Sequence, residues 1–354
     1  MTEAAVDVLI RNGLVLTMDS GQTAIPGGAV AVQGDRIAAV GSADTVGACS
    51  ARRVIDAGGG IIMPGLVNTH THAAMTLFRG LADDVPLMAW LNDHIFPAEA
   101  GLDHRKVYWG ALLACAEMIL SGTTTFCDMY LFEDAVAQAA RTAGMRAVVG
   151  EVLFDFPSPH YGSLERGFAY TETLIESYRG DALITVAVEP HSPYLCAPGL
   201  LQRSFELAAK HRLPMVIHLA ETESEVRTLR QRYGRTPVEH LENVGVLAPN
   251  VLACHCVQLS ATDIERLSRY GVKVSHNPES NMKLASGIAP VPAMLANHMT
   301  VGLGTDGCAS NNNLDLFTEM DMAAKLHKLN TMDTTVMDAQ TVLKMTTIEG
   351  ASAL

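Results

Sequence analysis

Short apolar runs alternate with longer amphipathic stretches along most of the chain. Eight runs have the length of strands, at residues 61–70, 123–129, 147–153, 184–191, 215–221, 250–256, 272–277 and 299–306. Between them, apolar residues recur every three or four positions, as in helices, at residues 105–120, 132–143, 199–211, 222–234, 261–270 and 314–329. Continuous apolar strands bounded by helices are what a sheet buried on both faces requires. The pattern therefore predicts an α/β fold whose eight parallel strands close into a (β/α)8 TIM barrel.

The first sixty residues have a different pattern. Residues 6–17, 29–40 and 53–56 are β-rich and are broken by Gly, Asn and Asp, which predicts a small antiparallel sheet. We therefore expect two domains, a β-sandwich at residues 1–60 and the barrel at residues 61–354. The last helix-like segment runs up to Leu354, so we expect the sandwich to be partial, with its complementing C-terminal strands absent.

Composition and charge narrow the class of protein. With 48% hydrophobic and 18% charged residues among 354, the chain has the composition of a folded globular protein. Lys and Arg total 25 against 38 Asp and Glu, and no basic run with interleaved aromatics is present, so we expect no nucleic acid partner. The N-terminus lacks the features of a signal peptide and no apolar run reaches about 18 residues, which predicts a cytoplasmic protein without a membrane partner. Seven cysteines without a CxxC pair are expected to be buried free thiols.

Polar residues end most of the predicted barrel strands. In a barrel of this type the active site lies at the C-terminal ends of the strands, so these residues are expected to meet on one face. They include three in the first strand, two in each of the fourth and fifth, and one in each of the last three: Asn68, His70, His72, Glu189, His191, His218, Glu221, His255, His276 and Asp306.

Four of these residues form a predicted metal site. His70 and His72 are two residues apart on a strand, so both side chains point to the same side. An isolated HxH would more often be incidental, but His218 and Asp306 end two other strands. Three nitrogens and one carboxylate oxygen complete a hydrolytic site that leaves room for water. Nitrogen and oxygen ligands suit zinc, and they also suit Fe²⁺ or Mn²⁺.

Longer motifs carry a resemblance that covers essentially the whole chain. They are IIMPGLVNTHTHAAMTLFRGLADD, WLNDHIFPAEA, SGTTTFCDMY, EPHSPYLC, IHLAET, CHCVQL, VSHNPESNMKLASG and GLGTDGCASNNNLD. In this order they resemble the amidohydrolase superfamily, in particular the mononuclear deaminases of the 5′-methylthioadenosine/S-adenosylhomocysteine branch. The resemblance implies hydrolysis of 5′-methylthioadenosine, 5′-deoxyadenosine, adenosine or S-adenosylhomocysteine to the inosine analogue and ammonia. It also implies one zinc per chain, bound by His70, His72, His218 and Asp306.

The resemblance and the residue chemistry together assign catalytic roles. Glu221, in HxxE, is expected to be the general acid and base that moves a proton to the ring nitrogen and the departing amine, although a glutamate at a helix start is a common structural feature. His255 would orient the attacking hydroxide and stabilise the tetrahedral intermediate, or be a core histidine. Asp306 would accept the proton of the hydroxide in addition to binding the metal, or be the aspartate of a turn.

Three further residues are expected to contact the nucleoside. The resemblance implies that Glu99 holds the ribose hydroxyls, that His191 reaches the purine and that Trp90 lines the pocket, although Trp90 would also suit the core face of a helix. His276 is expected to be structural. Ser280 and Asn281 are expected to serve the same loop.

The sequence departs from the branch where the substrate's amino-acid group would bind. Members that use S-adenosylhomocysteine have arginines near the end of strand three, because a guanidinium matches a carboxylate. Here Glu151 and Asp155 occupy that stretch and Arg166 is the nearest downstream candidate. We therefore expect neutral 5′-substituted adenosines to be better substrates than S-adenosylhomocysteine.

Three rival functions share the same fold. Related mononuclear enzymes deaminate guanine or hydrolyse s-triazines, but Glu99 and His191 favour a purine that bears ribose. A two-metal cyclic-amide hydrolase would need a lysine at the end of strand four, where this chain has His191. A non-catalytic barrel is disfavoured by the intact set of ligands. Besides a small-molecule nucleoside, the one partner left open is a further copy of the chain in a homo-oligomer.

Overall fold

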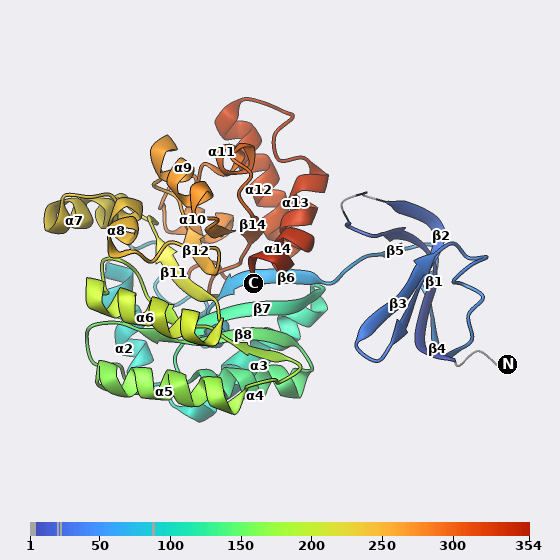
Figure 1. Cartoon of the computed structure of the whole chain (residues 1–354), viewed down its shortest axis with the longest axis horizontal. Coiled ribbons are helices and arrows are strands. Elements are labelled where there is room, and N and C mark those ends of the chain that lie inside the picture. Colours follow the sequence, from blue (N-terminus) through green and yellow to red (C-terminus); the bar gives the residue numbers. More distant parts are fainter. Residues whose placement is uncertain (1–4, 20, 22, 87–88) are drawn as a thin grey trace. The chain divides into compact units, whose positions relative to one another are not determined.

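The computed structural model describes residues 5–19, 21, 23–86 and 89–354 (Figure 1). It divides the chain into two compact units, Met1–Gly65 and Leu66–Leu354. The division separates the N-terminal β-sheet from the α/β part, so the α/β class with an N-terminal sheet is confirmed.

The first unit is a five-stranded sheet. Its strands are β1 (Val6–Leu16), β2 (Ala24–Gln33), β3 (Arg36–Gly41), β4 (Ala51–Asp56) and β5 (Ile61–Ile62). The order is β3-β2-β1-β4, and β5 also pairs with β1. Pairing of β1 with β2 and of β2 with β3 is antiparallel, but β4 and β5 run parallel to β1. The prediction of an antiparallel sheet was therefore wrong for β4, while β5 was not part of that prediction.

A long connection explains the parallel pairing of β4. The chain between β3 and β4 crosses the sheet, and Val46 in it packs against Leu9, Ala29 and Ala31 in the core. A crossover of this kind carries the chain from β3 at one edge of the sheet to the opposite edge, where β4 pairs with β1 in parallel. A two-residue hairpin joins only antiparallel neighbours. The apolar run predicted at residues 61–70 is also split, because its first two residues pair with β1 and its strand in the second unit begins at Leu66.

The second unit contains two parallel sheets. The first has the order β10-β8-β7-β6, with β9 also pairing with β8, and the second has the order β11-β12-β13-β14. The strands are β6 (Leu66–Thr71), β7 (Thr123–Tyr130), β8 (Arg146–Leu153), β9 (Ile184–Val186), β10 (Glu189–Pro190), β11 (Met215–Leu219), β12 (Val251–His255), β13 (Lys273–His276) and β14 (Val301–Leu303).

Backbone hydrogen bonds link the two sheets at both sides. The N–H of His218 donates to the carbonyl of His191 at 3.0 Å, next to a parallel bridge between Val188 and Met215. On the other side, the N–H of Asp306 donates to the carbonyl of His70 at 3.0 Å. The residues that follow β14 are thereby held beside β6, which brings the first and last strand ends of this unit together.

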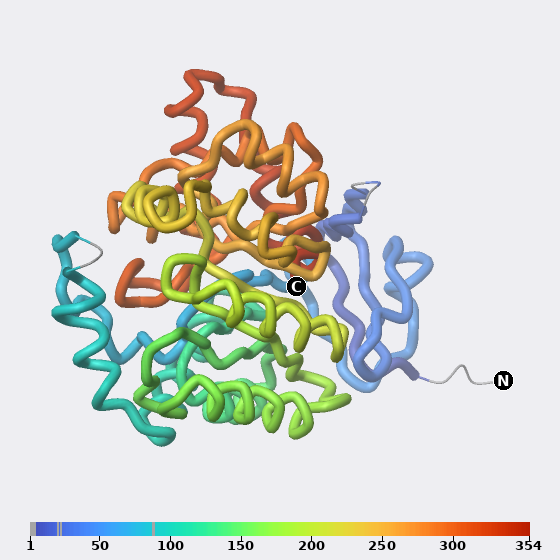
Figure 2. Tube along the Cα trace, turned by 60° about the vertical axis from the view of Figure 1, so that its left-hand side comes forward, coloured from blue at the N-terminus to red at the C-terminus, as the bar shows by residue number. Residues whose placement is uncertain are grey.

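Helices follow the strands and lie outside them in both views (Figure 1, Figure 2). The longer ones are α3 (His104–Leu120), α4 (Glu133–Ala143), α5 (Leu164–Ser177), α6 (Pro198–His211), α7 (Glu223–Tyr233), α8 (Pro237–Val244), α9 (Ala261–Arg269) and α12 (Leu316–Thr331). The shorter ones are η1 (Ala73–Phe78), η2 (Trp90–Ile95), α2 (Phe96–Glu99), α10 (Pro278–Lys283), α11 (Val291–Ala296), α13 (Ala339–Met345) and α14 (Ile348–Ala353). Among the described residues, no helix combines the length and the apolarity that crossing a bilayer would require.

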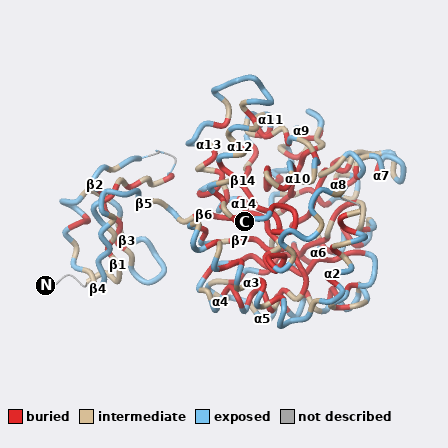
Figure 3. Tube along the Cα trace, turned by 180° about the vertical axis from the view of Figure 1, so that it is seen from behind, coloured by how far each residue is buried: buried red, intermediate tan, exposed pale blue. Residues whose placement is uncertain are grey.

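Burial is concentrated along the strands of the second unit (Figure 3). All residues of β6, β11 and β12 are buried, as the continuous apolar runs predicted. Glycine is required where strands approach closely. A Cβ on Gly304 would lie 2.6 Å from Asn277 Oδ1 and 2.8 Å from the backbone nitrogen of His70, so a side chain there would push β14 away from both neighbours.

Candidate active site

The strand ends of the second unit surround one pocket. It encloses about 700 Å³, and most of the sequence-predicted site residues line it: His72, Trp90, Glu99, His191, His218, Glu221, His255 and Asp306. They come from β11 and β12, from loops that follow strands, and from the segment η2–α2. His70 lies behind the pocket wall, and its ring packs edge-on against the rings of His72 and His218 with centroids 4.9 Å apart in both pairs.

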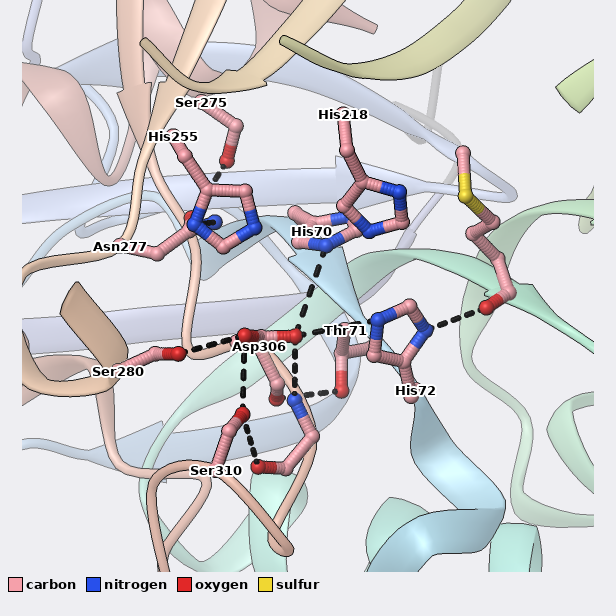
Figure 4. A network of polar contacts seen from close by, with 12 residues as sticks. His70, Thr71, His72, His218, His255, Ser275, Asn277, Ser280, Asp306 and Ser310 are labelled. Atoms are coloured by element: carbon pink, nitrogen blue, oxygen red, sulfur yellow. Dashed lines mark hydrogen bonds and ion pairs between the residues drawn. The ribbon is translucent and has the colours of Figure 1, made fainter. Parts of the chain in front are cut away.

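Four imidazoles and one carboxylate bring their donor atoms together (Figure 4). One donor atom from each of His70, His72 and His218 lies within 4.8 Å of the others, and the same holds for His70, His255 and Asp306. Asp306 Oδ1 lies 3.1 Å from His72 Nε2 and 3.6 Å from His70 Nε2. Both ring nitrogens of His70 are fully buried without a hydrogen-bond partner. Such a set of unpartnered nitrogens beside a carboxylate fits a tetrahedral metal ion.

Hydrogen bonds to main-chain carbonyls orient two of the imidazoles. His72 Nδ1 bonds the carbonyl of Met129, and His218 Nδ1 bonds the carbonyl of His191 at 2.8 Å. A carbonyl can only accept, so each Nδ1 carries a proton, and Nε2 is the nitrogen that holds the lone pair when the ring is neutral. This is the arrangement in which outer hydrogen bonds fix a metal-binding tautomer.

The Asp306 carboxylate is held from the side opposite the imidazoles (Figure 4). Its Oδ2 accepts hydrogen bonds from Ser280 Oγ at 2.6 Å and from Ser310 Oγ at 2.9 Å, and its Oδ1 accepts one from the N–H of Gly307 at 2.9 Å. Sequence reasoning placed Ser280 in a loop-holding role and missed Ser310. Nothing in the spacing of either serine indicated a contact with the carboxylate, because Ser280 lies in the short helix α10 and Ser310 in a turn, and neither has a periodic pattern.

Left-handed backbone turns aim several of these side chains. Ala220, His255 and Asp306 have φ angles of 50°, 70° and 60°, at or just after the ends of their strands. Non-glycine residues in this region cost roughly 1 kcal/mol or more, and such residues cluster at functional sites. The turns take the chain off each strand abruptly, so that the terminal side chains face the pocket instead of alternating away from it.

Burial and mutual repulsion set the protonation of the imidazoles. Burial, together with neighbouring imidazoles, lowers the pKa of His70 and of His218 well below the usual value, so both are neutral. Burial alone would lower the pKa of His72, but Asp306 raises it to about 9. Burial alone would raise the pKa of Asp306, but His72 holds it well below its usual range. The carboxylate therefore stays ionised and stabilises positive charge at this point of the pocket.

Glu221 lies in the pocket just beyond β11. Burial raises the pKa of its carboxyl group above the usual value, and its Oε1 accepts a hydrogen bond from Ser286 Oγ at 3.3 Å. The N–H of Glu221 donates to Oε2 of Glu225 at 2.9 Å, which fixes the start of α7. His255 bonds Asn281 Oδ1 through Nδ1 at 2.9 Å, so its Nε2 is left to face the cluster. Asn281 thus orients His255, a contact that the sequence did not indicate.

The outer part of the pocket is formed by the segment η2–α2 and the loop after β10. Burial raises the pKa of Glu99, which ends α2, to about 7. Burial and neighbouring imidazoles lower the pKa of His191 to about 3, so this ring is neutral, and its Nδ1 lies 3.0 Å from Ser192 Oγ. Trp90 is buried and also lines the pocket, so burial in the core and a place in the pocket wall do not exclude each other for this residue.

The acidic residues near the end of β8 do not form the pocket wall. Glu151 is fully buried and accepts a hydrogen bond from His160 Nδ1 at 2.7 Å, while Asp155 accepts one from the N–H of Ala197. Arg166 is exposed at the start of α5. None of the three acidic or basic side chains lines the pocket. Glu151 and Asp155 therefore have their hydrogen-bond partners in the protein itself.

His276 also lies outside the pocket. Its Nε2 is 3.1 Å from Nε2 of His327 on α12, and both rings are fully buried. The sequence predicted a structural histidine at this position without indicating its partner, which is 51 residues away.

Comparison with known proteins gives a consistent set of relatives. Residues 61–354 match the model of the amidohydrolase family. A 5-methylthioadenosine/S-adenosylhomocysteine deaminase of Syntrophobacter fumaroxidans is 61% identical over 355 residues, which cover 100% of this chain and 81% of that protein. A 5′-deoxyadenosine deaminase of Methanosarcina mazei is 48% identical, over 98% of this chain and 80% of that protein. A crystal structure of a Xanthomonas campestris adenosine deaminase with bound zinc superposes with a TM-score of 0.96 at 39% identity, over 99% of this chain and 80% of that chain.

Proposed function

The chain belongs to the amidohydrolase family, and on that premise we propose that it is a metal-dependent hydrolase that deaminates adenosine-type nucleosides. The substrates are 5′-methylthioadenosine, 5′-deoxyadenosine, adenosine and S-adenosylhomocysteine, and the products are the inosine analogue and ammonia. The observation that carries the proposal is that one pocket is lined by members of the His/Asp donor cluster together with Glu221 and Glu99. The names of the relatives agree with this substrate class.

We infer a (β/α)8 barrel from the order of the strands in the second unit. The strands β6, β7, β8, β9 with β10, β11, β12, β13 and β14 occupy eight successive positions, and hydrogen bonds link both sides of the two sheets. In this proposal residues 61–354 form the barrel domain and residues 1–60 a partial β-sandwich. A cytoplasmic location and a homo-oligomer stay predictions.

We propose that His70, His72, His218 and Asp306 hold one zinc ion per chain. The orphaned nitrogens of His70 and the carbonyl-anchored tautomers of His72 and His218 support this donor set. A zinc ion held there would supply Lewis acidity that makes water a nucleophile at neutral pH. Fe²⁺ and Mn²⁺ accept the same nitrogen and oxygen donors, so elemental analysis must identify the ion.

Glu221 is the proposed general acid and base. Its raised pKa lets the carboxyl group hold a proton close to neutrality, which is what a group that both gives and takes protons needs. It gives a proton to the ring nitrogen next to the amino-bearing carbon. His255, oriented by Asn281, hydrogen bonds the developing oxyanion. Asp306, which is ionised, takes the first proton that the attacking water loses. The second proton of the water passes through Glu221 to the amino group, which leaves as ammonia, and the proton on Asp306 is then transferred to Glu221, so that both groups return to their starting states.

Three residues are proposed to position the nucleoside. Glu99 accepts hydrogen bonds from the ribose hydroxyls, and it lines the same pocket as the His/Asp cluster. His191 is neutral, so it can offer a ring nitrogen to the purine without adding charge. Trp90 supplies an apolar wall. Recognition of a base by stacking and edge hydrogen bonds requires such a mixture of groups.

Ammonia release from a substrate panel tests the proposal. The panel is adenosine, 5′-methylthioadenosine, 5′-deoxyadenosine, S-adenosylhomocysteine, guanine and an s-triazine, with metal content measured on the same protein. We expect selective turnover of the adenosines with about one zinc per chain. If only guanine or only the triazine is turned over, the substrate class is that heterocycle and not an adenosine-type nucleoside. Absence of both metal and activity would indicate a non-catalytic barrel.

A further inference from the structure

Helices α7 and α8 begin with the same sequence signature but use it differently. Each has a threonine at its N-cap and a glutamate three residues later, the pattern of a capping box: Thr222 with Glu225, and Thr236 with Glu239. In α8 the box is complete, because Glu239 accepts a hydrogen bond from the N–H of Thr236 at 3.0 Å. In α7 the side chain of Glu225 reaches past the N-cap and bonds two residues that precede it. The glutamate of α7 is therefore directed away from its own helix and towards the end of β11.

Both oxygens of Glu225 bond the main chain at Glu221. Oε1 accepts a hydrogen bond from the N–H of Ala220 and Oε2 accepts one from the N–H of Glu221, each at 2.9 Å. Glu225 is 3% exposed, so solvent does not compete for these bonds. Ala220 has a left-handed φ of 50°, a conformation that costs a non-glycine residue roughly 1 kcal/mol or more. Two hydrogen bonds from one side chain thus hold the turn in which the chain leaves β11.

The other side of this turn is bonded as well. The N–H of Gln258 donates to the carbonyl of Ala220 at 2.7 Å, and Nε2 of Gln258 donates to the carbonyl of Ser286 at 2.7 Å. The hydroxyl group of Ser286 donates to Oε1 of Glu221 at 3.3 Å. A Cβ on Gly287 would lie 3.1 Å from Nε2 of Gln258, so the glycine leaves room for this contact. Glu221 is held by its main chain and by its carboxyl group, through three different segments.

Orientation matters at Glu221 because a general acid and base acts only within hydrogen-bond reach of the atom that exchanges the proton. This step rests on the role proposed for Glu221 above. Glu221 lines the pocket, whereas Glu225, Gln258 and Ser286 are not among the residues that line it. Any effect of Glu225 on the reaction must therefore pass through the residues that it holds.

We propose that Glu225 is a positioning residue for the deamination: it holds the main chain at Ala220 and Glu221 so that the carboxyl group of Glu221 points into the pocket. Ser286 completes the arrangement by holding the carboxyl group itself. A displacement of about 1 Å at a reacting group can lower a rate about a hundredfold. Loss of Glu225 should lower kcat and leave the binding of nucleoside and zinc unchanged, because other residues are proposed for those tasks.

Two substitutions of Glu225 give a graded loss in the zinc-loaded full chain. Glu225→Met has a side chain of similar length and removes both acceptors, whereas Glu225→Gln keeps one. We expect kcat for adenosine to fall about a hundredfold in Glu225→Met and about tenfold in Glu225→Gln, with KM and zinc content as in wild type.

The same two substitutions at Glu239 are the matched control. Glu239 caps α8 through the same type of bond to a backbone N–H, and it does not line the pocket. Its variants should keep kcat within about twofold of wild type, because substitutions away from the site rarely act on the reaction. A loss of kcat at Glu239 equal to that at Glu225 would show that any damage to a helix start has this effect, and would overturn the proposal.

A double mutant distinguishes positioning from general damage to the pocket. The variant Glu221→Gln has no acid and base left to position, so adding Glu225→Met to it should lower kcat by less than about threefold. General damage would lower the residual activity of Glu221→Gln by the same factor as the activity of wild type. Ser286→Ala gives a second, milder test, because it removes only the bond to the carboxyl group. It should lower kcat about threefold to tenfold in wild type and leave Glu221→Gln unaffected.

Hydrogen exchange tests the contact without any substrate. The N–H groups of Ala220 and Glu221 should exchange about tenfold faster in Glu225→Met than in wild type, because each has lost a buried acceptor. The N–H of Thr236 should be affected only in Glu239→Met. Unchanged exchange at Ala220 and Glu221 in Glu225→Met would overturn the proposal whatever the kinetics show.

The outcomes separate this inference from the proposed function. If wild type deaminates no nucleoside, the proposed function fails and the role of Glu225 in it fails too. If wild type is active, the proposed function stands and the kinetics decide on Glu225 alone. The positioning role is then overturned by a kcat of Glu225→Met within about threefold of wild type, by a change in KM or zinc content in place of kcat, or by additive effects in the double mutant.

Discussion

Burial gives each ionisable residue of the pocket a different protonation behaviour. Glu221 and Glu99 are shifted towards their neutral forms, whereas Asp306 keeps its charge because His72 lies 3.1 Å away. His191 and His218 are kept neutral by the same burial that would destabilise their cations. A single pocket therefore combines groups that can carry a proton, a fixed negative charge and neutral nitrogen donors, which is what a proton-transfer reaction near pH 7 requires.

Replacing Glu221 with glutamine tests its role in proton transfer. The amide keeps the size and hydrogen-bonding capacity of the side chain but cannot give or take a proton at neutral pH. We expect metal content equal to wild type and a decrease in kcat of about 10²- to 10⁴-fold for adenosine. Glu223→Gln is the matched control, because Glu223 is 74% exposed at its side chain and begins α7 two residues later. A Glu221→Gln variant within tenfold of wild type would contradict the assignment.

At the residue scale, the sequence predicted those site residues whose positions follow from the periodicity of strands. It missed residues whose positions follow from no periodic pattern. His70, His72 and His218 were identified because alternation along strands and the ends of apolar runs can be read directly. Ser310 and the partners of Glu151 were not, because a loop side chain can turn in many directions and only packing selects one.

The strands and helices place these residues through close contacts at a few points. One such contact is at Gly150 on β8, where the side chain of Glu189 from β10 passes close to the glycine. Both carboxylate oxygens of Glu189 are buried without a hydrogen-bond partner. Burial raises the pKa of Glu189 well above its usual value, so the side chain is a neutral acid inside the strand layer. The register of β8 against β10 depends on the lack of a side chain at Gly150.

Adding a methyl group at Gly150 is expected to destabilise the second unit. The Cβ of Gly150→Ala would lie 2.3 Å from Cδ and 2.4 Å from Cγ of Glu189, and this buried side chain has no room to move. Overpacking of this kind typically costs about 1–3 kcal/mol of the free energy of unfolding. Gly199→Ala is the control, because nothing lies within 4 Å of its Cβ and helix α6 favours alanine. Chemical denaturation measures both, and equal stabilities would disprove the close contact.

The pair His276 and His327 joins β13 to α12 and predicts a pH dependence of stability. Burial lowers the pKa of His327 to about 4 and that of His276 well below its usual value. In the unfolded chain both take up a proton near pH 6.5. Between these values the unfolded state binds more protons, so the free energy of unfolding falls as the pH is lowered from 6.5 to 4, by roughly 2–3 kcal/mol.

The variant His327→Gln isolates this contribution. Glutamine can still hydrogen bond His276 but does not titrate, so the variant should lose less stability than wild type between pH 6.5 and 4. Denaturant unfolding of zinc-loaded protein at several pH values gives the two slopes. Parallel curves for wild type and variant would show that the pair does not control the acid sensitivity.

The whole second unit is expected to depend on its metal, because the donor atoms come from β6, β11 and the loop after β14, which are distant in sequence. Removal of zinc by a chelator should abolish ammonia release and lower Tm. An ion present at a hundredfold excess over its Kd stabilises the native state by about 2.7 kcal/mol. Zinc added back should restore both properties and Mg²⁺ should not, since it prefers oxygen ligands. Unchanged Tm and activity in the metal-free protein would refute the proposed centre.

At the scale of the molecule, the sequence by itself determined what local periodicity can encode. Eight apolar runs placed the strands of the second unit, the polar residues at their ends marked the site, and Gly, Asn and Asp indicated the strands of the first unit. Only the tertiary structure decided which distant groups meet. It made β4 and β5 parallel to β1 and turned Glu151 to His160. Periodicity reports which face of an element is apolar, whereas crossovers and loop contacts depend on the packing of the complete chain.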